Sequence, residues 1–64
     1  MIEFKKRAPE DGKVCFDVMK KGEGFRGIIR FFKERKAWAL LSYPSGRIDY
    51  FDSLAEAKEE ALKI

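Results

Sequence analysis

The chain has 64 residues, a net charge of +3, no histidine and a single cysteine, Cys15. An internal disulfide and a Cys/His zinc site are therefore excluded, and the length suits one domain, residues 1–64, with one core. No apolar run approaches the roughly 20 residues that cross a bilayer, so we expect a reduced, cytoplasmic protein without a membrane partner.

The positive charge is unevenly distributed along the chain. Residues 1–48 contain twelve Lys and Arg against six Asp and Glu, whereas residues 49–64 contain two against five. An excess of cations on one part of a small domain favours a polyanionic partner. An equally weighted interpretation is that these charges only keep a small domain soluble.

The first third of the chain predicts a β-hairpin. Residues 1–7 alternate between apolar and charged side chains, residues 8–12 carry turn-forming Pro and Asp-Gly, and residues 13–20 alternate again. The side chains expected to face the core are Val14, Phe16 and Val18.

Three further strands are predicted beyond the glycines of residues 22–24, which allow the chain to reverse. Residues 25–33 are rich in β-branched and aromatic side chains, and Gly27 within them indicates a bulge or a close backbone approach. Residues 37–43 and 47–51 form the other two strands, separated by a Pro-Ser-Gly turn.

The C-terminus predicts a helix. Ser53 lies three residues before Glu56, as in a capping box, and residues from Leu54 onward favour helix. The expected apolar stripe consists of Leu54, Ala57, Ala61 and either Leu62 or Ile64, and Glu59 and Lys63 are spaced to pair. The predicted fold class is α+β, mostly β: a five-stranded antiparallel sheet or barrel with one C-terminal helix.

Residues for enzyme chemistry are scarce. Histidine is absent, Cys15 lies within a strand as a structural thiol would, and Asp52 suits the start of a helix. Gly22, Gly24 and Gly27 match a phosphate-binding motif in spacing but connect two strands. We therefore expect no catalytic residues, no cofactor and no metal.

The stretch from Gly27 to Phe51 combines aromatic and cationic side chains. Such a surface suits unpaired bases, because every base has a stackable face and every nucleotide has a phosphate. Trp38 shares its side of the strand with Lys36 and Ser42, although also with Leu40. The pattern predicts that Trp38 is exposed on a binding face.

This stretch resembles the cold-shock domains, which are oligonucleotide-binding barrels. Residues 27–33 are similar to the family's opening strand, residues 36–41 to its first ribonucleoprotein motif, and residues 49–52 to its second. The resemblance implies base stacking on Phe31, Trp38 and Tyr50, and phosphate contacts from Arg30 and Lys36. It also leads to the hypothesis that the N-terminal hairpin closes the barrel in a permuted order.

A second resemblance, to the AP2-type domains, rests on residues 25–28, Trp38 and residues 51–57. It implies a three-stranded sheet in the major groove of duplex DNA, with Arg26, Arg30 and Arg47 for guanine. A third hypothesis is a protein-interaction module or homodimer with an aromatic interface. Our first expectation is binding of single-stranded RNA or DNA with low sequence specificity. The predicted site residues are Arg26, Arg30, Phe31, Phe32, Lys33, Lys36, Trp38, Arg47 and Tyr50.

Overall fold

The structure is a computed structural model that describes residues 1–10 and 13–63, and for residues 8–10 and 13 it describes the backbone alone. The elements are β1 (Ile2–Glu10), β2 (Lys13–Lys20), β3 (Gly24–Phe32), β4 (Ala37–Ser42), β5 (Ile48–Phe51) and α1 (Leu54–Ala61).

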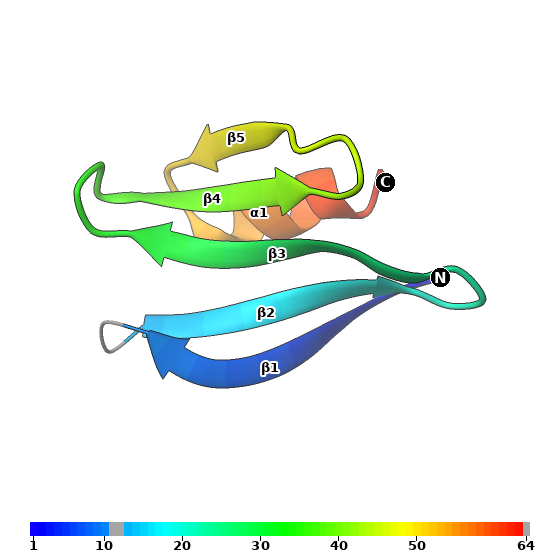
Figure 1. Cartoon of the computed structure of the whole chain (residues 1–64). Helices are drawn as coiled ribbons and strands as arrows, with labels where there is room; N and C mark the ends of the chain where they lie inside the picture. The colour runs from blue at the N-terminus through cyan, green and yellow to red at the C-terminus, as the bar shows by residue number, and fades with distance from the viewer. Residues whose placement is uncertain (11–12, 64) are drawn as a thin grey trace.

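The five strands form one antiparallel sheet in which every strand pairs with its neighbour in the sequence (Figure 1). The predicted five-stranded antiparallel sheet with one C-terminal helix is confirmed. The hypothesis that the hairpin closes a barrel is wrong. The hairpin continues the sheet by pairing β2 with β3, and β1 and β5 are its opposite edges.

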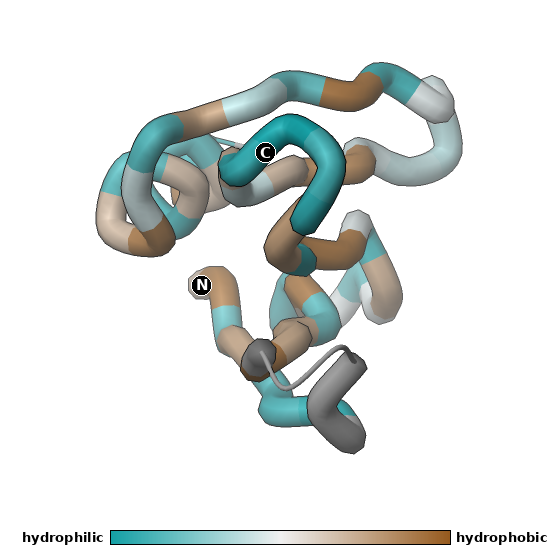
Figure 2. Tube along the Cα trace, turned by 90° about the vertical axis from the view of Figure 1, so that its left-hand side faces the viewer, coloured by the Kyte–Doolittle hydropathy of each residue, from teal (hydrophilic) through white to brown (hydrophobic). Residues whose placement is uncertain are grey.

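The core lies between the sheet and α1. Figure 2, a side view, shows the helix as a second layer on one side of the sheet. Register pairs Phe16 with Ile29 and Ile29 with Leu40, so these side chains point to the same side. The buried cluster between the two layers consists of Phe16, Val18, Ile29, Leu40, Ala57 and Ala61.

The helix begins as predicted. The Ser53 hydroxyl accepts a hydrogen bond from the Glu56 backbone N–H at 3.2 Å and donates one to the Glu56 carboxylate at 3.1 Å. Ala57 and Ala61 are fully buried, which lets the helix axis lie close to the sheet.

The end of the helix differs in two details from its prediction. Leu62 is exposed, so it does not extend the apolar stripe, and Ile64 lies outside the described residues. Lys63 pairs with Glu60 at 3.3 Å, three residues away, in place of Glu59.

The N-terminal turn also starts later than predicted. β1 runs on through residues 8–10, with a shift of register between Arg7 and Glu10. Residues 11 and 12 of the predicted turn lie outside the described part of the chain.

Gly27 marks a close approach of two strands, as its position predicted. It faces Ser42 across the β3–β4 ladder, and a Cβ atom there would collide with the Leu41 carbonyl oxygen. Next to it, the β2–β3 register shifts between Val18 and Met19, which is the irregularity of a bulge.

Gly27→Ala is expected to lower the free energy of unfolding by about 1–3 kcal/mol, because the added methyl group forces two paired backbones apart. Chemical denaturation followed by circular dichroism measures the effect. The control is Gly22→Asn, at a positive φ with open space around it, which should change stability much less. Equal stability of Gly27→Ala and the wild type would contradict the close approach.

Candidate functional site

The two sides of the sheet differ in what covers them. One side carries Ile29, Leu40 and the other core residues and is covered by α1. The other side, which we call the open face, has no helix over it in the described part of the chain (Figure 1). On β3, β4 and β5 the open face consists of Phe25, Ile28, Arg30, Phe32, Ala37, Ala39, Leu41, Ile48 and Tyr50, and Tyr43 lies on the same side just past the end of β4.

Trp38 lies on the helix-covered side, contrary to its predicted exposure on the binding face. It is half-buried and packs against the core cluster, on the same side as Leu40. The prediction failed because it counted Lys36 as part of the strand. Lys36 has a φ of 51° and lies in the β3–β4 turn, so its polarity says nothing about which side Trp38 occupies.

Phe31 was also predicted on the binding face and lies on the helix-covered side. Phe31 is the register partner of Trp38, and the two rings meet edge to face at 5.4 Å between centroids. Two of the three aromatic side chains that the cold-shock resemblance assigned to base stacking are therefore absent from the open face.

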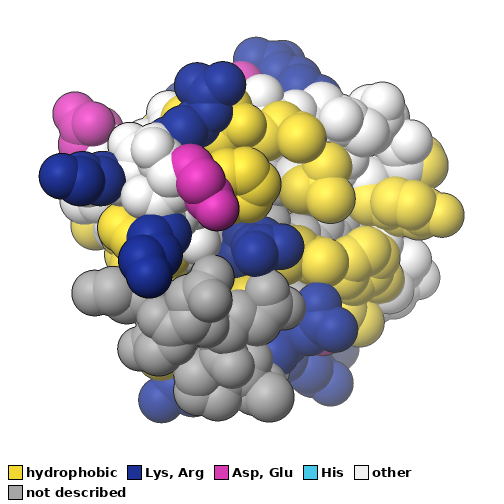
Figure 3. Space-filling model, turned by 60° about the vertical axis from the view of Figure 1, so that its left-hand side comes forward, with side chains coloured by type: hydrophobic (Ala, Val, Ile, Leu, Met, Phe, Trp, Pro, Cys, Tyr) yellow, Lys and Arg dark blue, Asp and Glu magenta, His cyan; other side chains and the backbone are white. Residues whose placement is uncertain are grey.

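The open face carries most of the exposed apolar surface. Of the seven large hydrophobic side chains exposed in the described residues, five lie there: Phe25, Leu41, Tyr43, Ile48 and Tyr50. Figure 3 shows hydrophobic side chains gathered on this side, with Lys and Arg side chains beside them. A soluble monomer seldom exposes a contiguous patch of this kind without a binding partner.

One end of the open face holds a cluster of rings and guanidinium groups. Phe32 and Tyr50 meet edge to face at 5.8 Å. The guanidinium carbon of Arg30 is 5.1 Å from the Phe32 ring centroid, and that of Arg35 is 4.4 Å from the Tyr50 centroid. These four residues, Arg30, Phe32, Arg35 and Tyr50, are called the ring cluster below.

Small residues on β4 make the ring cluster geometrically feasible. Phe32 lies opposite Ala37, and Tyr50 lies opposite Ala39, so the two rings approach each other from β3 and β5 over alanines. Ala39 is only 3% exposed beneath them. A larger side chain at either alanine would occupy the space in which the rings meet.

A second ring pair lies at the other end of the open face. Phe25 and Tyr43 are 5.6 Å apart between centroids, with 38% and 56% of their surface exposed. The Tyr43 backbone N–H donates to the Arg26 carbonyl at 2.9 Å, which ties the end of β4 to the start of β3.

The nine predicted site residues lie in four places, one of which is the helix-covered side, where Phe31 and Trp38 are found. Arg30, Phe32 and Tyr50 come together on the open face, and Lys33 and Lys36 lie exposed in the adjoining β3–β4 turn. Arg26 is half-buried beside the bulge and pairs with Glu23 at 3.4 Å. Arg47 follows the β4–β5 turn and bonds to Asp49, whose register partner is Leu40 on the helix-covered side. The nine residues therefore do not form one surface.

Sequence reasoning missed several members of the open face: Phe25, Ile28, Arg35, Leu41, Tyr43 and Ile48. Alternation by two along each strand does group Leu41 with Tyr43 and Ile48 with Tyr50. That signal was present, but nothing in the local pattern shows which side of the sheet the helix covers.

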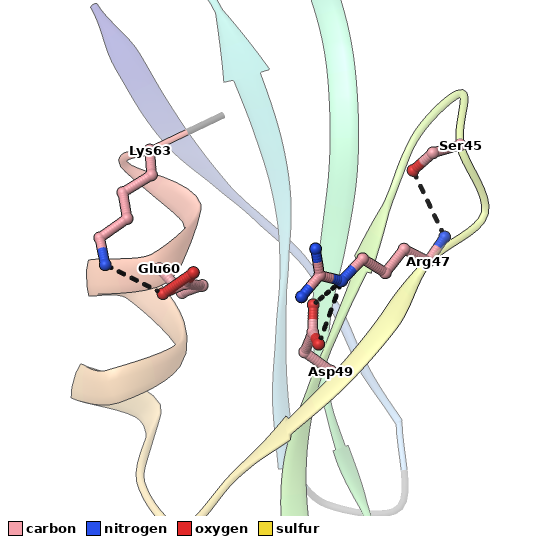
Figure 4. Close-up of polar contacts among 5 residues, drawn as sticks. All are labelled: Ser45, Arg47, Asp49, Glu60 and Lys63. Carbon is pink, nitrogen blue, oxygen red and sulfur yellow. Dashed lines mark hydrogen bonds and ion pairs between the residues drawn. The ribbon is translucent and has the colours of Figure 1, made fainter.

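A hollow lies between α1 and the β4–β5 ribbon. It encloses about 160 Å³ and is lined by Leu40, Ser42, Arg47, Asp49, Glu60 and Lys63. Arg47 pairs with Asp49 at 3.1 Å, and Lys63 pairs with Glu60 at 3.3 Å (Figure 4). Each cation is already paired with a carboxylate two or three residues away in the chain, so the hollow offers no surplus charge to a ligand.

Comparison of the chain with family models, with curated proteins and with solved structures yields no match. Within the described residues, no group of three or more Cys, Asp or Glu side chains is arranged to hold a metal ion. None of the helices described there has the length and apolar character needed to traverse a membrane.

The assignment of the two sides predicts that two aromatic truncations destabilise the protein to different extents. Trp38→Ala should lower the free energy of unfolding by about 3 kcal/mol, since it removes a ring packed on the core. Tyr50→Ala, at a side chain 40% exposed on the open face, should cost less than about 1 kcal/mol. Urea denaturation followed by circular dichroism compares them, and the reverse order of stability would show that the sides are assigned incorrectly.

Proposed function

We propose that this protein is a non-enzymatic module that binds single-stranded RNA or DNA on its open face. The observation that supports it most is the ring cluster, in which Tyr50 and Phe32 lie half-exposed beside Arg30 and Arg35. Aromatic rings next to guanidinium groups offer both stacking for a base and attraction for a phosphate.

The β3–β4 turn adds charge beside the ring cluster. Residues 33–36 contain three cations and one carboxylate, Glu34, and all four side chains are exposed. Among the described residues, Lys33, Arg35 and Lys36 make no ion pair. A phosphate can therefore pair with these cations without first breaking an ion pair between a cation and a carboxylate.

The open face suits an unpaired strand better than a duplex. Reading base edges in the major groove requires polar side chains that protrude from the sheet. Here Arg26 and Arg30 are half-buried, and the more exposed positions are Leu41, Tyr43, Ile48 and Tyr50. Rings and aliphatic groups contact the faces of unstacked bases, which a duplex does not present. For this reason we rank the AP2-like hypothesis second, although the helix does pack behind β4 and β5.

The proposal shares one feature with the cold-shock domains, which is the stacking of bases on the face of a sheet. Of the residues to which that resemblance assigns a contact with nucleic acid, Arg30 and Tyr50 lie on the open face, and Phe32 lies beside them. Stacking on an open sheet needs no closed barrel, because the faces of the bases contact side chains and not the strand edges.

Tyr50→Ala and Arg35→Ala should each weaken binding of a labelled oligothymidylate of twelve nucleotides. Loss of one stacking ring costs about 1–3 kcal/mol, which is roughly a five- to hundredfold rise in Kd. Arg35→Ala should also reduce the slope of log Kd against log salt, because one cation fewer displaces counterions. Fluorescence anisotropy at several salt concentrations measures both quantities.

Arg47→Ala is the matched control, since it removes a cation on the other side of the sheet. It should shift Kd much less than Arg35→Ala. Equal losses for the two arginine variants would mean that only overall charge attracts the strand. Titration with the same sequence as a duplex distinguishes the single-strand hypothesis from the AP2-like hypothesis. Tighter binding of the duplex would reject the single-strand hypothesis.

A second candidate is a homodimer through the open face. It is favoured by the side chains in the middle of that face, Ile28, Leu41 and Ile48, which are aliphatic and do not stack on bases. Aromatic and Arg residues are enriched in the centres of protein interfaces, and Lys, Asp and Glu are depleted there.

Sedimentation velocity over a wide concentration range tests the dimer. If the open face binds a second copy, the mass should rise with concentration, and Ile48→Lys should restore the monomer by burying a charge in the interface. A concentration-independent monomer mass would reject this candidate and leave the nucleic-acid proposal unaffected.

A further inference from the structure

The two ring pairs on the open face lie at opposite ends of it. Phe32 and Tyr50 belong to the end beside the β3–β4 turn, whereas Phe25 and Tyr43 belong to the end beside the β2–β3 and β4–β5 turns. Both pairs are partly exposed, and both are held by tilted or edge-to-face contacts between rings.

The register gives the distance between the two pairs. Tyr50 and Phe32 lie opposite Ala39 and Ala37 of β4, and Tyr43, just past the end of β4, follows those two alanines by four and six positions. At about 3.3 Å per strand residue, the pairs are roughly 13–20 Å apart. Stacked nucleotides spaced by 3.4 Å would cover this distance in about four to six steps, which is about five to seven nucleotides, and an extended strand would need fewer.

The surface between the pairs is apolar and free of negative charge. On β3, β4 and β5 the open-face side chains between them are Ile28, Leu41 and Ile48, with Arg30 and Ala39 beside the ring cluster. None of the described open-face residues on these three strands is a carboxylate. On β2, Asp17 lies opposite Ile28 and pairs with Arg7 at 3.4 Å.

The two ends differ in charge. The ring cluster adjoins the cationic turn of residues 33–36. At the Phe25–Tyr43 end, Arg26 and Lys20 both pair with Glu23, at 3.4 and 3.2 Å. Lys21 in the β2–β3 turn is exposed and makes no ion pair among the described residues. The first end therefore offers stacking beside three unpaired cations, and the second offers stacking beside one.

From this arrangement we infer that one unpaired strand of about four or more nucleotides spans both ring pairs, with one base on each. The inference rests on the proposed function and adds the length of the ligand and a division of roles. The ring cluster binds a base and its phosphates, and Phe25 with Tyr43 binds a second base that only a longer strand reaches.

The experiment measures binding of oligothymidylates of two, four, six and eight nucleotides by competition against the labelled octamer. For the wild type, affinity should rise in a step once the strand reaches the second pair. Tyr43→Ala should remove that step, raising the Kd of the octamer about five- to a hundredfold while leaving the dinucleotide unchanged. Tyr50→Ala should weaken all lengths.

Two further variants separate stacking from loss of structure. Tyr43→Leu keeps apolar volume but removes the ring, so it should behave like Tyr43→Ala towards the octamer. Leu62→Ala, at an exposed position after the helix, should bind every length as the wild type does. The salt dependence of octamer binding should stay the same in Tyr43→Ala, because the substitution removes a ring and no cation.

The outcomes are distinguishable. Equal weakening of the dinucleotide and octamer by Tyr43→Ala, or an affinity that rises smoothly with length in every variant, would overturn the inference while nucleic-acid binding stands. No competition by any oligonucleotide in a monomeric wild type would overturn the proposed function itself. A concentration-dependent dimer that binds no oligonucleotide would assign the two ring pairs to a protein interface.

Discussion

The arrangement of this protein depends on the contact between Ala57 and Ala61 of α1 and the buried side chains Val18, Ile29 and Leu40 of the sheet. Alanine has little volume, so the helix backbone lies close to the strands and both alanines are excluded from water. The capping box of Ser53 and Glu56 starts the helix at the residue that allows this contact. This contact between the helix and the sheet determines which side of the sheet becomes the core.

A single short helix leaves much of the sheet uncovered. Eight helical residues span about 12 Å, whereas five strands side by side extend roughly 20 Å across and the longest strands about 30 Å along their axes. One side of the sheet is therefore partly covered and the other remains open. The rings of Phe25, Tyr43 and Tyr50 are exposed to water by this shortage of covering structure. Contacts between rings, and the contact of Arg35 with Tyr50, shield these rings only in part.

The two arginines of the ring cluster, Arg30 and Arg35, make different contacts on the open face. The side chain of Arg30 lies next to the small residue Ala39 and its Nε atom is buried, while its guanidinium group reaches the Phe32 ring. Arg35 comes from the turn and lies over Tyr50. The first arginine fills space and the second covers a ring face that a planar ligand could take over. Separate substitutions of Arg30 and Arg35 would therefore report on stability and on binding to different extents.

The sequence by itself determined the order and number of the strands, the position of the helix and its cap, and the close approach at Gly27, because these follow from alternation, propensity and glycine geometry over a few residues. The same alternation placed Leu41 with Tyr43 and Trp38 with Leu40 on opposite sides. Only the tertiary structure decided which of those sides is covered. The left-handed backbone at Lys36 separates that residue from the strand pattern, and the helix reaches the sheet through contacts more than fifteen residues away. The contacts of the helix are a property of packing between distant segments, and no local pattern contains them.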